Sequence, residues 1–261
     1  MRDADSPSPA ESGPLPGARA RSIENSVAIV TGASGGIGQS IAVALAAERA
    51  VVCLVGRNGA RLEEAEAGVR RAGPSGCLAV RADLTSEDDL ARLSALVKDR
   101  FGGVDLLVHC AGEYERAPLE TAPIEDFDAL YRANMRGPYR LTQLVLRSLR
   151  QRKGDIIFVN STQGLAATAS VGQYAATQHG IRAVADSLRE EINSAGVRVT
   201  VLHAGSTATP RQQRIREATG RPYEPERLLQ PEDIASIVVA VLRLPRTAEV
   251  TSLVIRPMQK T

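Results

Sequence analysis

The fold of this chain is decided by residues 27–38, VAIVTGASGGIG. A short apolar run leads into Thr31-Gly32, and glycines recur at Gly35, Gly36 and Gly38. An apolar helical pattern follows over residues 39–49, so strand, glycine turn and helix occur in the order of a nucleotide-binding unit. Glycines let the backbone approach a pyrophosphate, and the free N–H groups at a helix start favour an anion. The stretch therefore predicts a dinucleotide site, with an ordinary glycine turn as the alternative.

Composition narrows the class of protein. The 261 residues suggest one large domain, and a hydrophobic content of 43% with only 3% aromatics means that Val, Leu, Ile and Ala fill the core. A net charge of +2 is too small to favour nucleic acid, and no apolar run has the length of a membrane span. Cys53, Cys77 and Cys110 are widely spaced, and no Cys/His spacing resembles a zinc site. We expect no metal, buried thiols and a cytoplasmic, reducing location.

Residues 1–22 are rich in Pro, Ser, Gly, Ala and Arg. They lack the apolar centre of a secretory signal, and three acids within the first 11 residues disfavour a transit peptide. We predict a disordered N-terminal extension, with an artefact of expression or gene annotation as the alternative, followed by one domain over 23–261.

Strand-like and helical patterns alternate along that domain. Further strands are predicted over 50–55, 77–82, 104–109, 154–159, 197–202 and 250–255. Helices are predicted over 61–72, 86–101, 123–150, 174–194 and 231–244, and Gly137-Pro138 predicts a kink or a helix pair within the third. Because each strand is a continuous apolar run, we expect a doubly wound parallel α/β sheet of about seven strands, covered by helices on both faces. The composition of residues 205–229, rich in Arg and Pro, is typical of a mobile flap.

Ligands of such sheets bind beyond the carboxyl ends of the strands, so residues that follow strands should converge there. Arg57 follows the second strand where an acid would select NAD, and its guanidinium favours the 2′-phosphate of NADP; a solvated loop arginine is the alternative. Asp83 follows the third strand and suits either an adenine amino group or a turn. Ala111-Gly112 lets backbone approach a ribose. Four arginines give the flap a basic character that could select an anionic substrate or could simply be solvated: Arg211, Arg214, Arg216 and Arg221.

From about residue 24 onward the chain resembles the classical short-chain dehydrogenase/reductase family. The matching pieces are TGASGGIG at 31–38, Asp83-Leu84, Ala111-Gly112, Asn134, Ser161, Tyr174 (13 positions after Ser161) and LPRTAEVTSLVIRPM at 244–258. The resemblance implies a single-domain Rossmann-like fold, a nicotinamide cofactor, a small-molecule substrate, and a homodimer or homotetramer paired through the segments 123–150 and 174–194. With Arg57, the implied cofactor is NADP(H). The implied cofactor-binding residues are Gly32, Ser34, Gly36, Ile37, Gly38, Arg57, Asp83, Leu84, Cys110, Ala111, Gly112, Tyr174, Gln178, Gly205 and Thr207.

The same resemblance implies catalytic roles. Tyr174 would give or take the proton at the substrate oxygen, Ser161 would hydrogen-bond that oxygen, and Asn134 would hold a water in a proton relay. The family pattern is Tyr-x-x-x-Lys, but this chain reads YAATQ, so Gln178 stands at the lysine position. The family lysine bonds the nicotinamide ribose and lowers the pKa of the tyrosine, and Gln178 can attempt only the first.

The lost charge is large enough to matter. A unit charge 4 to 5 Å away at an effective dielectric constant of 20 is worth about 3 to 4 kcal/mol, which is roughly 2 to 3 pKa units. We therefore expect carbonyl reduction to be slowed on the order of a hundredfold or more. His109 and Cys110 replace the family's Asn-Asn pair, and Ala204 replaces a proline before Gly205. We interpret His109 and His179 as packing residues rather than as substitutes for the missing cation.

Three functions are consistent with these residues. The first is an NADP(H)-dependent oxidoreductase acting on a small carbonyl or alcohol, slow or specialised. The second is a pseudoenzyme that serves as a cofactor-binding sensor or as an oligomer partner. The third is an enzyme of non-redox acid–base chemistry, such as dehydration, cyclisation or isomerisation, in which Tyr174 acts as a neutral acid.

Overall fold

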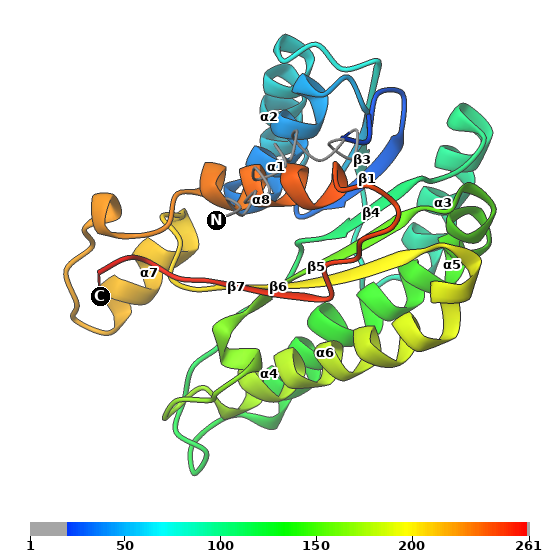
Figure 1. The fold of residues 1–261 in the computed structure, drawn as a ribbon. Coiled ribbons are helices and arrows are strands. Elements are labelled where there is room, and N and C mark those ends of the chain that lie inside the picture. Colours follow the sequence, from blue (N-terminus) through cyan, green and yellow to red (C-terminus); the bar gives the residue numbers. More distant parts are fainter. Residues whose placement is uncertain (1–19, 260–261) are drawn as a thin grey trace, which may run out of the picture.

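The computed structural model describes residues 20–259, and residues 1–19 of the predicted extension lie outside the described part. Its centre is a seven-stranded sheet in the order β3-β2-β1-β4-β5-β6-β7 (Figure 1), in which every neighbouring pair is parallel. The strands are β1 Val27–Thr31, β2 Val51–Gly56, β3 Gly76–Arg81, β4 Leu106–His109, β5 Asp155–Ser161, β6 Arg198–Ala204 and β7 Ser252–Ile255. The prediction of a parallel sheet of about seven strands is confirmed.

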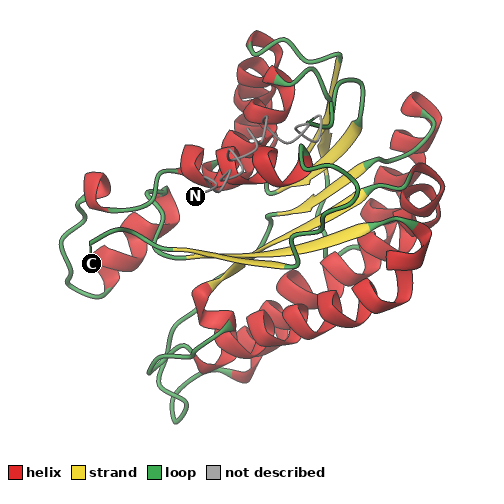
Figure 2. Ribbon diagram, viewed as in Figure 1, coloured by secondary structure: helices red, strands yellow, loops and turns green. Residues whose placement is uncertain are grey.

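Helices cover both faces of the sheet (Figure 2). One face carries α1 Gly36–Ala47, α2 Gly59–Arg71 and α8 Pro231–Leu242, and the other carries α3 Glu87–Phe101, α5 Gly137–Arg152 and α6 Gly172–Ile192. Alternate residues of one strand enter different cores: Ala28 and Val30 pack with the first group of helices, whereas Val27 and Ile29 pack with the second. Burial on both faces explains why each strand reads as an unbroken apolar run.

The strand order reverses its direction at β1. The chain runs from β1 outward through β2 to β3, and then returns to the free edge of β1 with β4. In a doubly wound sheet this point opens a crevice beyond the carboxyl ends of the two central strands, where ligands bind. Most residues predicted to bind a cofactor directly follow β1, β2, β3, β4 or β6, and Tyr174 and Gln178 lie in the helix after β5, so all of them come from this edge.

The long helical segment after β4 breaks one turn earlier than predicted. Helix α4, Ile124–Tyr131, passes into a π-helical turn, Arg132–Arg136, and α5 then begins at Gly137. Pro138 therefore lies in the first turn of α5, where its missing N–H costs little. Gly137 is required because a Cβ there would lie 2.7 Å from the Leu84 carbonyl oxygen.

The predicted flap contains more regular structure than its composition indicated. Helix α7 spans Pro210–Ala218, and 3₁₀ turns occupy Pro225–Arg227, Thr162–Gly164 and Asn193–Ala195. The Thr209 side chain caps α7 by accepting a hydrogen bond from the Gln212 N–H, and Pro210 presets the first helical turn. Most of α7 is exposed, with Arg216, which is 8% exposed, as its one buried residue. A helix without an apolar stripe gives no periodic signal in the sequence, so α7 was not predicted within the flap.

Three arginines meet one carboxylate at the amino ends of the strands. Asp155, which begins β5 and is 3% exposed, pairs with Arg21 at 2.5 Å, Arg198 at 2.6 Å and Arg246 at 3.2 Å. Arg198 also donates to the carbonyls of Leu244 and Ala248. This cluster ties the start of the described chain and the segment before β7 to the middle of the sheet.

Within residues 20–259, none of the helices combines the length and apolar content that a membrane crossing requires.

Candidate active site

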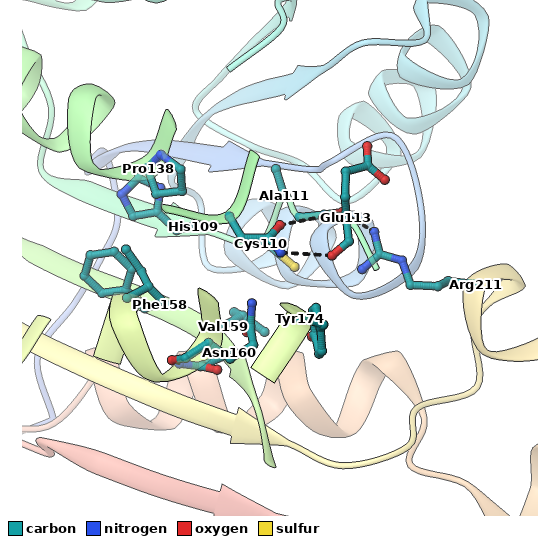
Figure 3. A pocket seen from close by; sticks show the side chains of 14 residues that line it. His109, Cys110, Ala111, Glu113, Pro138, Phe158, Val159, Asn160, Tyr174 and Arg211 are labelled. Carbon is teal, nitrogen blue, oxygen red and sulfur yellow. Dashed lines mark hydrogen bonds between the residues drawn. The ribbon is translucent and has the colours of Figure 1, made fainter. Parts of the chain in front are cut away.

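A pocket opens at the carboxyl edge of the sheet, beside the ends of β4 and β5, and Arg211 of α7 reaches into it from one side (Figure 3). Three of the predicted catalytic residues line it, namely Asn134, Tyr174 and Gln178. Its other lining residues are His109, Cys110, Ala111, Gly112, Glu113, Pro138, Phe158, Val159, Asn160, Ile181 and Arg211. Elements far apart in sequence therefore meet at one concave site.

The glycine turn lies against the end of β4. Gly32 has a φ of +68°, and a Cβ there would be 2.8 Å from the Ala111 nitrogen. A Cβ on Gly38 would strike the Gly32 carbonyl. The Thr31 hydroxyl accepts hydrogen bonds from the backbone N–H groups of Cys110 and Ala111, at 3.0 and 3.1 Å. The turn and the end of β4 thus form one fixed unit whose close approach only glycines permit.

The start of α1 suits a bound anion. Its N-cap is Gly35, which offers no side chain to the first backbone N–H groups, and its first turn holds no acid. These N–H groups remain free for an external acceptor at the positive end of the helix dipole. The residues present therefore fit the pyrophosphate of a nicotinamide dinucleotide. Ser34 lies beside Gly56 in the same region, whereas Ile37 packs against the core.

Arg57 lies beyond β2, as predicted, but it has a partner that sequence reasoning missed. Its guanidinium forms an exposed ion pair with the carboxylate of Glu113, which follows β4. The Arg57 carbonyl accepts a hydrogen bond from Arg81 at 3.2 Å. A second arginine therefore lies near the position that would receive a 2′-phosphate.

Asp83 and Leu84 have structural tasks. The Asp83 carboxylate accepts from the backbone N–H and the hydroxyl of Thr85, both at 2.8 Å, and so closes the turn before α3. Leu84 is 7% exposed, within the core, and its carbonyl faces Gly137. The turn interpretation of Asp83 accounts for one carboxylate oxygen, and the second remains available to a ligand.

Asn134 lies in the π-helical turn, a kind of distortion often found at functional sites. Its amide oxygen accepts from the Glu113 N–H at 2.7 Å, and its nitrogen donates to the Glu113 carbonyl at 3.0 Å and to the Thr177 hydroxyl at 3.1 Å. The side chain is 4% exposed. Hydrogen bonds to protein groups thus engage both the oxygen and the nitrogen of this amide, and they fix the loop after β4 against α6.

Ser161 ends β5 and Tyr174 lies in the first turn of α6. The Tyr174 ring meets Tyr114 edge-on, with the ring centroids 4.9 Å apart. Burial raises the pKa of the Tyr174 phenol, Tyr114 acts in the same direction, and the Ser161 hydroxyl and the Arg211 guanidinium oppose them. The phenol is therefore protonated at neutral pH, and it can donate a proton more readily than it can accept one.

Gln178 lines the same pocket as Tyr174. The side chain is 7% exposed, and its amide nitrogen lies 3.4 Å from the Thr177 hydroxyl. Its backbone carbonyl accepts from the Asn160 amide at 2.9 Å. Thr177 lies three residues after Tyr174 on the same helix face, and its hydroxyl contacts Asn134, Gln178 and the Tyr174 carbonyl. The i+3 spacing from Tyr174 was the signal that could have identified this residue.

The packing interpretation fits His109 but not His179, which is exposed on α6. His109 is 3% exposed and stacks on Phe158 with centroids 4.8 Å apart. The Thr142 hydroxyl donates to the Pro138 carbonyl, so it accepts from His109 Nε2, 2.9 Å away. Burial lowers the pKa of His109 to about 3, so the ring is neutral. His179 is exposed, and its Nδ1 lies 2.9 Å from the Ala175 carbonyl.

The residues after β6 form the base of α7. Gly205 donates to the Ile255 carbonyl, and Thr207, 5% exposed, pairs with Leu229 in an isolated bridge. Neither lines the pocket described above. Thr209, which the sequence analysis missed, lies nearer to the glycine turn: a Cβ on Gly36 would be 3.2 Å from its methyl group. Among residues 20–259, no group of three His, Cys, Asp or Glu side chains could hold a metal ion.

Comparison with known proteins agrees with this geometry. Residues 26–220 match the family described as short chain dehydrogenase. An uncharacterised oxidoreductase of Staphylococcus epidermidis is 32% identical over 237 residues, which cover 90% of this chain and 99% of that protein.

Solved structures are similar over the same extent. An alcohol dehydrogenase from the archaeon Thermococcus sibiricus, complexed with 5-hydroxy-NADP, has a TM-score of 0.81 at 28% identity and covers 90% of this chain and 98% of its own. A 3-ketoacyl-(acyl-carrier-protein) reductase from Brucella melitensis, complexed with NADH, has a TM-score of 0.78 at 27% identity, again over 90% and 98%.

Proposed function

Because the chain belongs to the short chain dehydrogenase family, we propose that it is an NADP(H)-dependent oxidoreductase that interconverts a small carbonyl compound and its alcohol. The observation that carries this proposal is the convergence of Asn134, Tyr174 and the residues after β4 on one pocket at the edge where the glycine turn lies. When bound, the nicotinamide supplies the hydride acceptor or donor.

The chain's own residues then handle the substrate oxygen. The Tyr174 phenol donates a proton to a carbonyl that is being reduced, and in the reverse direction its deprotonated form, the tyrosinate, receives one from an alcohol that is being oxidised. The Ser161 hydroxyl hydrogen-bonds the same oxygen. Asn134 holds Glu113 and Thr177 in place through its amide, which keeps the loop after β4 beside Tyr174. Neutral Gln178 leaves Tyr174 with a high pKa, so donation to a carbonyl is favoured over proton removal from an alcohol.

The test is NADPH consumption against a panel of aldehydes and ketones, with Gln178→Lys and Tyr174→Phe beside the wild type. We expect slow turnover in the wild type, an increase on the order of a hundredfold in Gln178→Lys, and loss in Tyr174→Phe. Turnover that survives in Tyr174→Phe would contradict the role of the phenol.

The preference for NADP(H) rests on Arg57 and its neighbour Arg81. Titration calorimetry with NADPH and NADH should give tighter binding of NADPH, and Arg57→Ala should remove the difference. Arg71→Ala, at the far end of α2, is the matched control. Equal affinities of the wild type for both cofactors would contradict the preference.

Neutral Gln178 also favours a second candidate, a cofactor-binding pseudoenzyme. NADPH binding without turnover of any substrate, together with turnover in Gln178→Lys, would support it. A half-buried Tyr174 with a raised pKa suits non-redox acid chemistry as well, and turnover of a hydroxy compound without a change in NADPH absorbance would identify that function.

We also propose a homodimer or homotetramer that pairs through the long helices. Large apolar side chains are exposed along α4 and α5, namely Ile124, Phe127, Tyr131 and Tyr139. Sedimentation of the purified protein tests this, and a monomer at micromolar concentration would contradict it.

A further inference from the structure

We propose that Arg211 is the positive charge of this active site: carried by α7, it serves Tyr174 in the electrostatic role that neutral Gln178 on α6 cannot fill. The proposal rests on the proposed function, since it assigns a positioning residue to the same reaction. It concerns a residue of α7, not of the Tyr-x-x-x-Gln segment.

Four contacts hold the first turn of α7 at the pocket. Ala208 donates to the Leu229 carbonyl at 2.7 Å, and Leu229 donates to the Ser206 carbonyl at 3.1 Å, which fixes the segment that leads into α7. Thr209, the N-cap, lies over Gly36. The Arg211 guanidinium donates to the Gly112 carbonyl (Figure 3). The side chain therefore reaches the pocket, although Arg211 as a whole residue is exposed.

Of the described residues that line this pocket, Arg211 alone carries a permanent positive charge. The charged and titratable groups around Tyr174 are Arg211 from α7, Glu113 and Tyr114 from the loop after β4, and His109 and Cys110 at the end of β4. His109 is neutral, and burial raises the pKa of the Cys110 thiol to about 12. Glu113 is paired with Arg57. Within residues 20–259, Arg211 forms no ion pair, so its charge is not cancelled by a carboxylate.

Among residues 20–259, no lysine lies near the pocket. Of the 32 Lys and Arg residues only three are lysines, Lys98, Lys153 and Lys260. Lys98 lies in the last turn of α3 and Lys153 follows α5, both at the opposite end of the sheet, and Lys260 lies outside the described residues. The effect of Arg211 on Tyr174 has the required sign, because it lowers the pKa of the phenol against the upward effect of burial.

The position of this cation has a mechanistic meaning. A lysine on α6 would be fixed to the same helix as Tyr174, whereas Arg211 arrives with α7. Acid–base readiness of Tyr174 then depends on the contacts that hold the first turn of α7 at the pocket.

The decisive measurement is the titration of Tyr174 in the protein without cofactor or substrate. The chain has five tyrosines; ¹³Cζ-tyrosine labelling resolves them by NMR, and Tyr174→Phe identifies the relevant signal. We expect Tyr174 in Arg211→Gln to titrate at higher pH than in the wild type. Arg211→Lys should restore the wild-type behaviour, and Arg214→Gln, an exposed arginine on the same helix, should leave it unchanged.

Kinetics provide the second readout. At neutral pH, turnover by Arg211→Gln should fall about tenfold through kcat, with its pH profile displaced toward higher pH. In a Gln178→Lys background the same substitution should cost less than about twofold, because the new lysine supplies the charge.

An unchanged Tyr174 titration in Arg211→Gln overturns the proposal. So does an increase in KM for anionic substrates alone, which would make Arg211 a substrate-binding residue. A shifted titration in a chain that turns over no substrate would contradict the proposed function and leave the electrostatic role of Arg211 standing.

Discussion

At Tyr174, burial and charge act on one phenol in opposite directions. The surrounding protein disfavours the tyrosinate, and the nearby cation favours it. Gln178 keeps the hydrogen-bonding capacity of the helix position but removes its charge. The side chains around Tyr174 therefore determine the reaction rate at this site, whereas the fold determines where the site lies.

The carboxylate of Glu113 forms an ion pair with the guanidinium of Arg57, the group proposed to bind the 2′-phosphate of NADPH. A 2′-phosphate must compete with it. Exposed ion pairs are worth about 0.2 to 1 kcal/mol, so Glu113→Gln should tighten NADPH binding by up to about fivefold and leave NADH binding unchanged. Calorimetry with both cofactors measures this, with Glu115→Gln as the control. Equal tightening of both cofactors would contradict the competition.

His109 predicts a specific dependence of stability on pH. Its pKa is about 3 in the folded protein and near 6.5 when exposed, so the unfolded chain binds the extra proton between these values. Stability is therefore full above pH 6.5 and is lost as pH falls toward 3. Between pH 7 and 5, wild type should lose about 2 kcal/mol more of its unfolding free energy than His109→Gln.

Urea unfolding at both pH values measures this difference, with the exposed His179→Gln as the control. Buried His203, whose pKa burial also lowers, adds to the slope in both proteins and cancels in the comparison. Parallel pH slopes for wild type and His109→Gln would rule out the assignment.

At the scale of elements, the unit β1–turn–α1 depends on which glycine is replaced. A Cβ on Gly38 strikes the Gly32 carbonyl, whereas a Cβ on Gly35 meets nothing within 4 Å. Gly38→Ala should abolish measurable NADPH binding and lower stability by about 1 to 3 kcal/mol. Gly35→Ala should retain the wild-type fold and stability. Calorimetry and thermal unfolding test both, and equal behaviour of the two variants would contradict this account.

Sequence predicted the elements that carry a strong local pattern. The strands show as apolar runs, and the glycine turn and Tyr174 show as motifs. Helix α7 was not predicted because most of its residues face solvent. The π-helical turn was not predicted because the sequence Gly137-Pro138 indicated a break one turn later. The pairing of Arg57 with Glu113 joins residues 56 positions apart and depends on the assembled sheet, so no local pattern could indicate it.

At the scale of the whole molecule, Asp155 holds several distant segments together at the edge opposite the pocket. Asp155→Ala would leave Arg198, 7% exposed, without its carboxylate. Loss of one partner of a buried pair costs about 3 to 5 kcal/mol, so the variant should unfold at markedly lower urea concentration while NADPH affinity is kept. Glu48→Ala, which removes the exposed partner of Arg243, should cost less than about 1 kcal/mol.

The strand order also bears on how the protein is made. Each strand after β1 joins the free edge of one already present, first β2 and β3 on one side, then β4, β5, β6 and β7 on the other. A nascent chain can thus extend its sheet in the order in which a ribosome delivers it, without inserting a strand between two others. Until residues 252–255 emerge, the fully buried β6 is an open edge, and translational pausing in that interval exposes it to aggregation.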